Sequence, residues 1–302
     1  MNINEAFRKG IEILKIAGNE ASAHDAGALL CFAAHCDRAF LYSHGTDEFE
    51  GVLCDHYFSM LQSRAVGMPL QYLTGVQEFM SLPFEVGRGV LVPRQETELL
   101  VETVMNLCRK QVKLAGIHYS QEAGDAIVDN GKAADSILDI GTGSGCVAVS
   151  LAYYMPECIV TAIDRMPEAI VIAQRNAKLN EVADRVRFIE SDLFKAIVGE
   201  KFDIIVSNPP YIRTDDIKEL QREVRCFEPM EALDGGNDGL HFYRAIIKKA
   251  PGFLKEGGML AFETGYDQAA DVAELMSGCF SDMRIYKDLS GINRVVTGIC
   301  GK

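Results

Sequence analysis

Ile137-Leu-Asp-Ile-Gly-Thr-Gly-Ser-Gly145, followed directly by Cys146-Val-Ala-Val-Ser-Leu-Ala-Tyr-Tyr154, decides the fold. The first four residues form a short apolar run typical of a buried parallel strand, and the second segment has the length of a helix. The glycines between them allow a tight turn and the close approach of a ligand. They do not follow G-x-G-x-x-G, which disfavours a dinucleotide-dependent dehydrogenase. We expect a nucleotide-binding turn here; a turn without a ligand remains the alternative.

The alternation of short apolar runs with helix-length segments continues toward the C-terminus. Helix-length segments, notably residues 167–180, separate most of the short apolar runs, and this alternation predicts an α/β fold with a mainly parallel sheet. The last two runs lie close together without a helix between them, which indicates an antiparallel final strand. The runs occupy residues 137–140, 159–163, 186–189, 204–206, 259–262, 283–286 and 294–299.

The first 75 residues differ from the rest because their apolar positions recur at helical spacing, as in Ile3, Phe7, Ile11 and Leu14. Ser22 and Asp25 suggest a helix cap. Residues 76–95 show short, roughly alternating apolar runs typical of a β-hairpin. We therefore predict a helical domain (1–75), a hairpin linker (76–95) and an α/β domain (96–302). The 116–135 connection lacks a clean period, and no role is assigned to it.

Composition excludes several classes of protein. The 302 residues include 30 basic and 43 acidic ones, for a net charge of −13, which repels nucleic acid and disfavours DNA or naked RNA as the main substrate. The nine cysteines and six histidines are scattered without the spacing of a metal site, so we expect no metal. No apolar stretch reaches the roughly 20 residues of a membrane span, and no signal peptide is visible, so we expect a cytoplasmic protein.

Two acidic positions follow the next strands of the predicted sheet. Asp164 ends the 159–163 run about twenty residues after the glycine-rich turn, where a carboxylate can accept hydrogen bonds from both hydroxyls of a ribose. Asp192 could bond an adenine amino group, and Leu193 could pack on the ring. Either aspartate could instead be an ordinary turn or helix-capping residue.

Ser207-Asn208-Pro209-Pro210-Tyr211 carries the most specific chemistry. Two consecutive prolines fix φ, remove two backbone donors and keep Asn208 out of the helical region. The Asn208 side-chain oxygen and the Pro209 carbonyl can each accept one hydrogen of a planar NH2 group, and the Tyr211 ring can flank it. Such pairing orients the nitrogen and favours its attack on an electrophile. A proline turn that merely ends a strand is the alternative.

D-I-G-T-G-S-G, Asp164 and N-P-P-Y, in this order, resemble class I S-adenosylmethionine-dependent methyltransferases that act on planar nitrogen. Pro69-Leu-Gln-Tyr-Leu-Thr-Gly75, Val90-Leu-Val-Pro-Arg-Gln-Glu-Thr-Glu98 and Phe227-Glu-Pro229 extend the resemblance to HemK-type glutamine N5-methyltransferases of peptide-chain release factors. The resemblance covers nearly the whole chain. It implies a Rossmann-like, mainly parallel sheet with an antiparallel last strand and a small N-terminal helical bundle.

The resemblance also implies the reaction: methyl transfer from S-adenosylmethionine, leaving S-adenosylhomocysteine, to the glutamine of the Gly-Gly-Gln loop of a release factor. Asn208 and Pro209 would hold the glutamine amide and Tyr211 would flank it, with Pro210 in the same substrate-binding string. Residues 1–75 would bind the release factor, with the hairpin as a hinge; the alternative is a purely stabilising domain. No metal, nucleic acid or membrane is implied. The cofactor pocket would be lined by Gly141, Thr142, Gly143, Ser144, Gly145, Asp164, Asp192, Leu193 and Asn208.

Other readings and three departures from the family remain. The nearest alternative is a glutamine methyltransferase of a ribosomal protein. More distant ones are an adenine-N6 or guanine-N2 nucleic-acid methyltransferase, which the acidic charge disfavours, and a non-catalytic module that binds S-adenosylmethionine. The sequence departs from the family at Gln95, which replaces the usual proline after Arg94, and at Leu193, where many members carry a bulkier residue. The 116–135 connection is also longer than we expect for the family.

Overall fold

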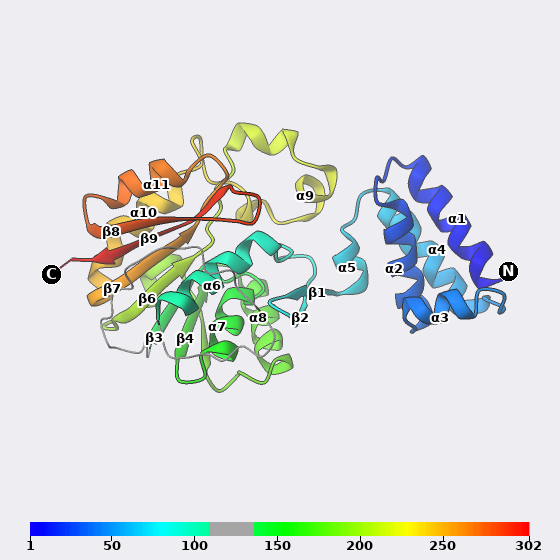
Figure 1. Cartoon of the computed structure of the whole chain (residues 1–302), viewed down its shortest axis with the longest axis horizontal. Coiled ribbons are helices and arrows are strands. Elements are labelled where there is room, and N and C mark those ends of the chain that lie inside the picture. Colours follow the sequence, from blue (N-terminus) through cyan, green and yellow to red (C-terminus); the bar gives the residue numbers. More distant parts are fainter. Residues whose placement is uncertain (109–135, 302) are drawn as a thin grey trace. The chain divides into compact units, whose positions relative to one another are not determined.

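The computed structural model describes residues 1–108 and 136–301, which form two compact units (Figure 1). The first unit comprises Met1–Val76, Val86–Arg88 and Glu219–Glu228, and the second comprises the other described residues. The chain therefore leaves the second unit after Lys218 and returns to it at Pro229. The 116–135 connection lies outside the described residues.

The first unit is helical, as expected for the N-terminal region. Leu14, Leu29 and Leu30 are fully buried together with Tyr57 and Leu61, because apolar residues at helical spacing share the inner face of each helix. Asn2 begins the first helix with a reciprocal capping box to Glu5. The helices of this unit are α1 (Ile3–Ile16), α2 (Ser22–Ala34), α3 (Arg38–Ser43), α4 (Gly51–Ala65), α5 (Leu70–Thr74) and α9 (Arg222–Phe227).

The expected cap at Ser22 and Asp25 is wrong. The N-cap of α2 is Ala21, whose methyl group cannot accept a hydrogen bond, and Asp25 is buried against α4. Asp25 accepts from Arg64 Nε at 2.7 Å, and Arg64 Nη1 donates to Glu223 Oε2 of α9, also at 2.7 Å. Burial alone would raise the pKa of Asp25, but hydrogen bonds from neighbouring side chains, including Arg64, bring it below its ordinary value. The buried Asp25 carboxylate is engaged with Arg64 and is thus unavailable for capping.

The second unit contains a seven-stranded sheet in the order β5-β4-β3-β6-β7-β9-β8. All neighbours are parallel except β9, which is antiparallel to both β7 and β8. This confirms the predicted α/β class with an antiparallel last strand. The strands are β3 (Ser136–Ile140), β4 (Ile159–Asp164), β5 (Val186–Glu190), β6 (Phe202–Ser207), β7 (Leu254–Glu263), β8 (Phe280–Lys287) and β9 (Asn293–Cys300).

Both faces of the sheet are covered, because successive side chains of each strand point to opposite sides. Ile137 belongs to the core formed with α6 (Glu98–Leu107), α7 (Cys146–Tyr154) and α8 (Pro167–Leu179). The next residue, Leu138, belongs to the core on the other face. That core contains residues of α10 (His241–Phe253) and α11 (Ala269–Met276) (Figure 1). Short 3-10 helices complete the unit: η1 (Gln95–Thr97), η2 (Leu193–Ala196), η3 (Thr214–Glu219) and η4 (Met230–Ala232).

The hairpin formed by β1 (Val76–Phe79) and β2 (Leu82–Glu85) is built into the second unit. Phe79 and Phe84 are buried in its core. The side chain of Asn176 on α8 accepts from Glu85 N at 2.6 Å and donates to Glu85 O at 2.9 Å, so it replaces a missing strand neighbour. The hairpin therefore packs as part of the sheet domain. The chain changes from one unit to the other directly before the hairpin, at Val76, and again after it, at residues 86–88.

Among the helices that the structure describes, none combines the length and the hydropathy that a bilayer span requires.

Candidate active site

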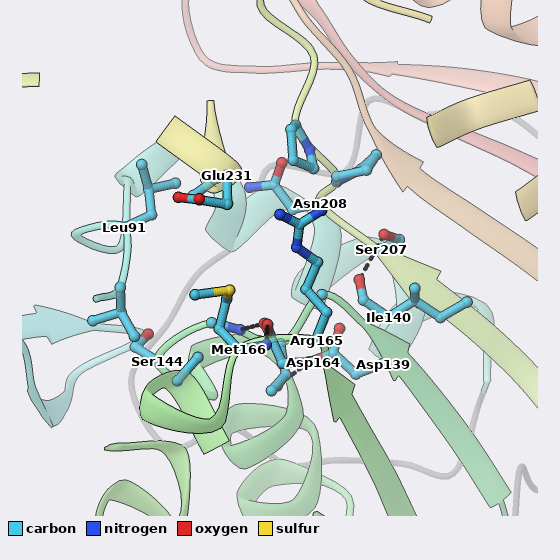
Figure 2. Close-up of a pocket in the computed structure, with 18 of the residues that line it drawn as sticks. Leu91, Asp139, Ile140, Ser144, Asp164, Arg165, Met166, Ser207, Asn208 and Glu231 are labelled. Carbon is cyan, nitrogen blue, oxygen red and sulfur yellow. Dashed lines mark hydrogen bonds between the residues drawn. The ribbon is translucent and has the colours of Figure 1, made fainter. Parts of the chain in front are cut away.

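A pocket lies at the carboxyl ends of the parallel strands, where open α/β sheets bind ligands. The turns after β3, β4, β5 and β6 line it, together with residues 89–97 and 229–232. In Figure 2 the side chains of Arg165 and Met166 extend into it from the turn after β4, and Asn208 and Glu231 lie on its opposite side. Of the predicted site residues, the pocket is bordered by Gly141, Thr142, Gly143, Ser144, Asp164, Asp192, Leu193, Asn208, Pro209 and Pro210.

The glycines of the glycine-rich turn have two different structural roles. Gly141 and Gly143 have φ values of +75° and +55°, and a Cβ at either would meet no atom within 4 Å. These positions keep space open above the turn. Gly145 does not border the pocket: a Cβ there would lie 2.9 Å from Cβ of Ala173. Gly145 therefore allows α7 to pack against α8, whereas Gly141 and Gly143 leave room for a ligand.

Asp164 connects this turn to the next one. Its Oδ2 accepts from Gly143 N and its Oδ1 from Met166 N, each at 2.9 Å (Figure 2). Burial raises the pKa of the Asp164 carboxyl, while the backbone hydrogen bonds lower it. A carboxylate oxygen can accept more than one hydrogen bond, so both oxygens keep capacity for the hydroxyls of a ligand.

Asp139, the acidic residue inside D-I-G-T-G-S-G, also borders the pocket, although the sequence argument gave it no role. It is buried at the end of β3, and its Oδ2 accepts from Thr142 Oγ1 at 2.6 Å. Burial raises the pKa of Asp139 to about 7, against the opposing effect of the Thr142 hydrogen bond. Its position one residue before the strand ends was the signal that could have identified it.

The turn after β5 presents an apolar side chain to the pocket. Leu193 has a φ of +51°, a left-handed conformation that non-glycine residues rarely adopt. The Ser191 hydroxyl stabilises it by donating to Leu193 O at 2.7 Å and accepting from Ala196 N at 3.0 Å. Asp192 is exposed, and its ion pair with Lys195 lowers its pKa. Strained backbone of this kind is typical of binding sites.

The proline turn after β6 is anchored on both sides. Ser207 Oγ donates to Ile140 O at 2.7 Å, which ties the end of β6 to the end of β3 (Figure 2). Asn208 Nδ2 donates to Thr97 Oγ1 at 3.1 Å. Because the nitrogen of the Asn208 amide is used in this way, its Oδ1 is left as the acceptor. Pro209, the next residue, lines the same pocket.

Tyr211 does not border the pocket. Its ring packs against the core that contains α10 and α11, and burial raises the pKa of its hydroxyl above the ordinary value. Its backbone carbonyl accepts from Gln268 Nε2 at 2.9 Å, and Gln268 is itself buried. In this structure Tyr211 therefore fixes the end of the proline turn, and Gln268 is a supporting residue that sequence reasoning missed.

Glu263 is a further residue that sequence reasoning missed. It ends β7 and is 2% exposed, and Oε2 has no hydrogen-bond partner among the described residues. Burial raises its pKa to about 7, although a hydrogen bond from Thr97, the charge of Arg294 and a hydrogen bond from Asn208 lower it. No local sequence motif points to Glu263, because only the pairing of β6 with β7 brings it beside the proline turn.

Comparison with known proteins gives the family. A release factor glutamine methyltransferase of Clostridium acetobutylicum is 36% identical, over 100% of this chain and 99% of that protein. One of Koribacter versatilis is 37% identical, over 99% and 98%. The chain belongs to this family. Family models described as "PrmC N-terminal domain" and "Methyltransferase small domain" match residues 5–75 and 125–224.

Membership of the release factor glutamine methyltransferase family confirms the resemblance drawn from the motifs. A solved methyltransferase structure from Pyrococcus furiosus, 19% identical, covers 74% of this chain and 91% of its own with a TM-score of 0.51, which supports the class I fold of the second unit. In residues 1–108 and 136–301, no group of three or more His, Cys, Asp or Glu side chains could hold a metal ion.

Proposed function

We propose that this chain transfers a methyl group from S-adenosylmethionine to the side-chain amide nitrogen (N5) of the glutamine in the Gly-Gly-Gln loop of peptide-chain release factors. Full-length relatives carry the name of this activity. The observation that carries the proposal is the Asn208 amide: its nitrogen donates to Thr97, which leaves its oxygen as an acceptor, and Asn208 and Pro209 both line the pocket. This pair of acceptors matches the two hydrogens of a primary amide.

The residues of the pocket fit S-adenosylmethionine. Gly141 and Gly143 leave open space where a Cβ would project, Asp164 offers carboxylate oxygens to ribose hydroxyls, and Leu193 supplies an apolar surface for a base. S-adenosylmethionine supplies a methyl group on a positively charged sulfur, which is already a strong electrophile. The protein therefore needs to align and polarise the acceptor rather than to activate the donor.

At the acceptor, Asn208 and the Pro209 carbonyl each accept one hydrogen of the substrate NH2 group. This would fix the plane of the substrate amide and raise the electron density on its nitrogen. The nitrogen would then take up the methyl group as the sulfur–methyl bond breaks and S-adenosylhomocysteine leaves. The methylated nitrogen would be strongly acidic and would lose a proton to water after the new bond has formed, so Asn208 positions the substrate and does not titrate. Pro209 and Pro210 lack N–H groups and cannot compete with the substrate as donors.

The first unit is proposed to bind the body of the release factor. Its match to a family-specific N-terminal model over residues 5–75 supports this role. The test compares a full-length release factor with a short Gly-Gly-Gln peptide. We expect a much lower KM for the full-length protein at a similar kcat. Equal KM values would indicate that the first unit only stabilises the enzyme.

The experiment that tests the activity offers the purified protein radiolabelled S-adenosylmethionine with a release factor, a ribosomal protein or naked RNA. We expect label only in the release factor, on the glutamine of the Gly-Gly-Gln peptide after proteolysis. Label in the ribosomal protein or in RNA would replace the proposed acceptor, and binding of the cofactor without transfer to any of the three would indicate a binding module. A release factor as substrate also assigns the enzyme to the cytoplasm, where translation ends.

A further inference from the structure

Glu263 is a buried carboxyl group that the proposed reaction does not itself use. Ser207 of β6 pairs with Phe262 of β7 in the parallel register, so the residues that follow them, Asn208 and Glu263, are neighbours at the same edge of the sheet. An ionisable side chain that is 2% exposed is costly to bury. Its placement directly behind the acceptor turn calls for a reason.

Thr97 connects the two residues. Its hydroxyl accepts from Asn208 Nδ2 at 3.1 Å, and the side chains of Thr97 and Asn208 both act on the Glu263 carboxyl as donors that lower its pKa. An ionised carboxylate only accepts hydrogen bonds, so it fixes the direction of both neighbours. If the Asn208 amide were flipped, its oxygen would face the carboxylate oxygens and the threonine lone pairs. The flipped state is therefore disfavoured as long as Glu263 is ionised.

We propose that Glu263 is a positioning residue which, together with Thr97, fixes the orientation of the Asn208 amide so that Oδ1 is the acceptor for the substrate NH2 group. This inference rests on the proposed function, because it presupposes that Asn208 holds an amide. It extends the acceptor site beyond the proline turn to Thr97 on η1 and to Glu263 at the end of β7.

The groups that face Glu263 determine when it is ionised. Arg294 on β9 favours the charged form and Glu96 on η1 disfavours it, while the hydrogen bonds from Thr97 and Asn208 favour it. The hydroxyls of Tyr211 and Tyr243 and the thiol of Cys146 also lie within its electrostatic reach, and burial raises the pKa of each, so all three are neutral near pH 7. A protonated Glu263 could donate to Thr97 and would release the constraint on Asn208. Turnover should therefore fall as Glu263 takes up a proton.

The test uses the full-length Glu263→Gln variant with a purified release factor and S-adenosylmethionine. We expect kcat to fall by roughly tenfold to hundredfold, as when one oriented polar contact is lost. The KM for the release factor and the affinity for S-adenosylmethionine should stay unchanged. The kcat of the wild-type enzyme should rise with pH around about 7, and that of the variant should not. An unchanged kcat and pH profile in Glu263→Gln would overturn the proposal.

Two variants of Thr97 keep the test valid if Glu263→Gln folds poorly. Thr97→Ser retains the hydroxyl and should retain kcat, whereas Thr97→Val removes it and should lose as much as Glu263→Gln does. Met276→Ala serves as the matched control, because Met276 is fully buried on α11 and its loss tests destabilisation alone. The control should keep the pH profile of the wild type. Equal activity of Thr97→Ser and Thr97→Val would contradict the role of the hydroxyl.

A measurement without substrate separates this inference from the proposed function. In protein labelled with ¹³C-glutamate, one carboxyl resonance should titrate near pH 7, and this resonance should be absent from Glu263→Gln. Thr97→Val should raise the pKa further, because the hydrogen bond that lowers it is gone. If these shifts appear but the release factor is not methylated, the proposed function fails and the network stands. If Thr97→Val leaves the Glu263 resonance unchanged, Thr97 does not act on this carboxyl and the inference itself is wrong.

Discussion

The turns after β3 and β6 follow neighbouring strands of the sheet but differ in their residues and in what they contribute to the pocket. The turn after β3 uses Gly141 and Gly143 at positive φ to keep side chains away from the pocket. The turn after β6 uses Pro209 and Pro210 to remove backbone donors and leave acceptors. The absence of side chains at Gly141 and Gly143 leaves room for a ligand, and the rigid proline turn supplies the acceptors that orient it. Substitutions in the two turns should therefore affect binding and turnover separately.

Asn208→Ala should have the largest effect on turnover. Removing the oriented acceptor should lower kcat by about 10²-fold or more, while the affinity for S-adenosylmethionine stays largely intact. Steady-state kinetics with a release factor and calorimetric titration with the cofactor measure the two quantities. A parallel loss of cofactor affinity and kcat would mean that the proline turn also binds the cofactor.

Gly143→Val should affect the other turn and the other quantity. A β-branched side chain fits poorly at a φ of +55° and projects into the open space above the turn. We expect the dissociation constant for S-adenosylmethionine to rise about tenfold or more, while kcat at saturating cofactor changes little. The same calorimetric titration measures it, and a variant whose only defect was in kcat would show that the two turns do not divide the work.

Glu263→Gln tests the support behind the proline turn through stability. Folding raises the pKa of Glu263 from 4.5 to about 7, so the folded state binds this proton more tightly than the unfolded chain does. The stabilisation from this group is complete below about pH 4.5 and is lost as the pH rises through about 7. The melting temperature of the variant relative to wild type should therefore rise by a few degrees from about pH 5 to about pH 8.

Circular dichroism suits this measurement, because the chain has no tryptophan. Asp139, whose pKa is also raised to about 7, is present in both proteins and cancels in the difference. A difference in melting temperature that does not change with pH would contradict the raised pKa of Glu263.

Glu223→Gln should have the smallest effect. Glu223 pairs with Arg64 on the first unit, but its side chain is 34% exposed, and ion pairs open to solvent contribute little. We expect the free energy of unfolding to fall by less than about 1 kcal/mol, measured by denaturant titration, with kcat unchanged. Asp25→Asn, which loses the buried partner of the same Arg64, should cost more. Equal effects would mean that exposure does not control these pairs.

Local strings predicted most of the fold and the two turns. The conformations of residues 137–145 and 207–211 could be predicted from their glycines and prolines, because the φ preferences of these residues do not depend on distant parts of the chain. Hydrophobic periodicity likewise predicted the helical N-terminal region and every strand of the large sheet, because burial on one or two faces leaves a repeating pattern. The family then followed from the order of the motifs.

The supporting residues could not be predicted in the same way. Thr97, Glu263 and Gln268 come from separate parts of the chain and meet Asn208 or Tyr211 only through the pairing and packing of the sheet. Similarly, α9 lies between β6 and β7 in the sequence, and no sequence signal shows that it packs with α4 through Glu223 and Arg64 instead of with these strands. Register and long-range ion pairs are properties of the assembled core, so single-sequence patterns do not contain them.

The place of β9 between β7 and β8 has a consequence for biosynthesis. Strands β7 and β8 leave the ribosome before Asn293 does, and until then each lacks the neighbour that it has in the finished sheet. Arg294, whose charge acts on Glu263, arrives with the same strand. A nascent chain without β9 therefore lacks both the strand that joins β7 to β8 and the charge of Arg294 beside Glu263.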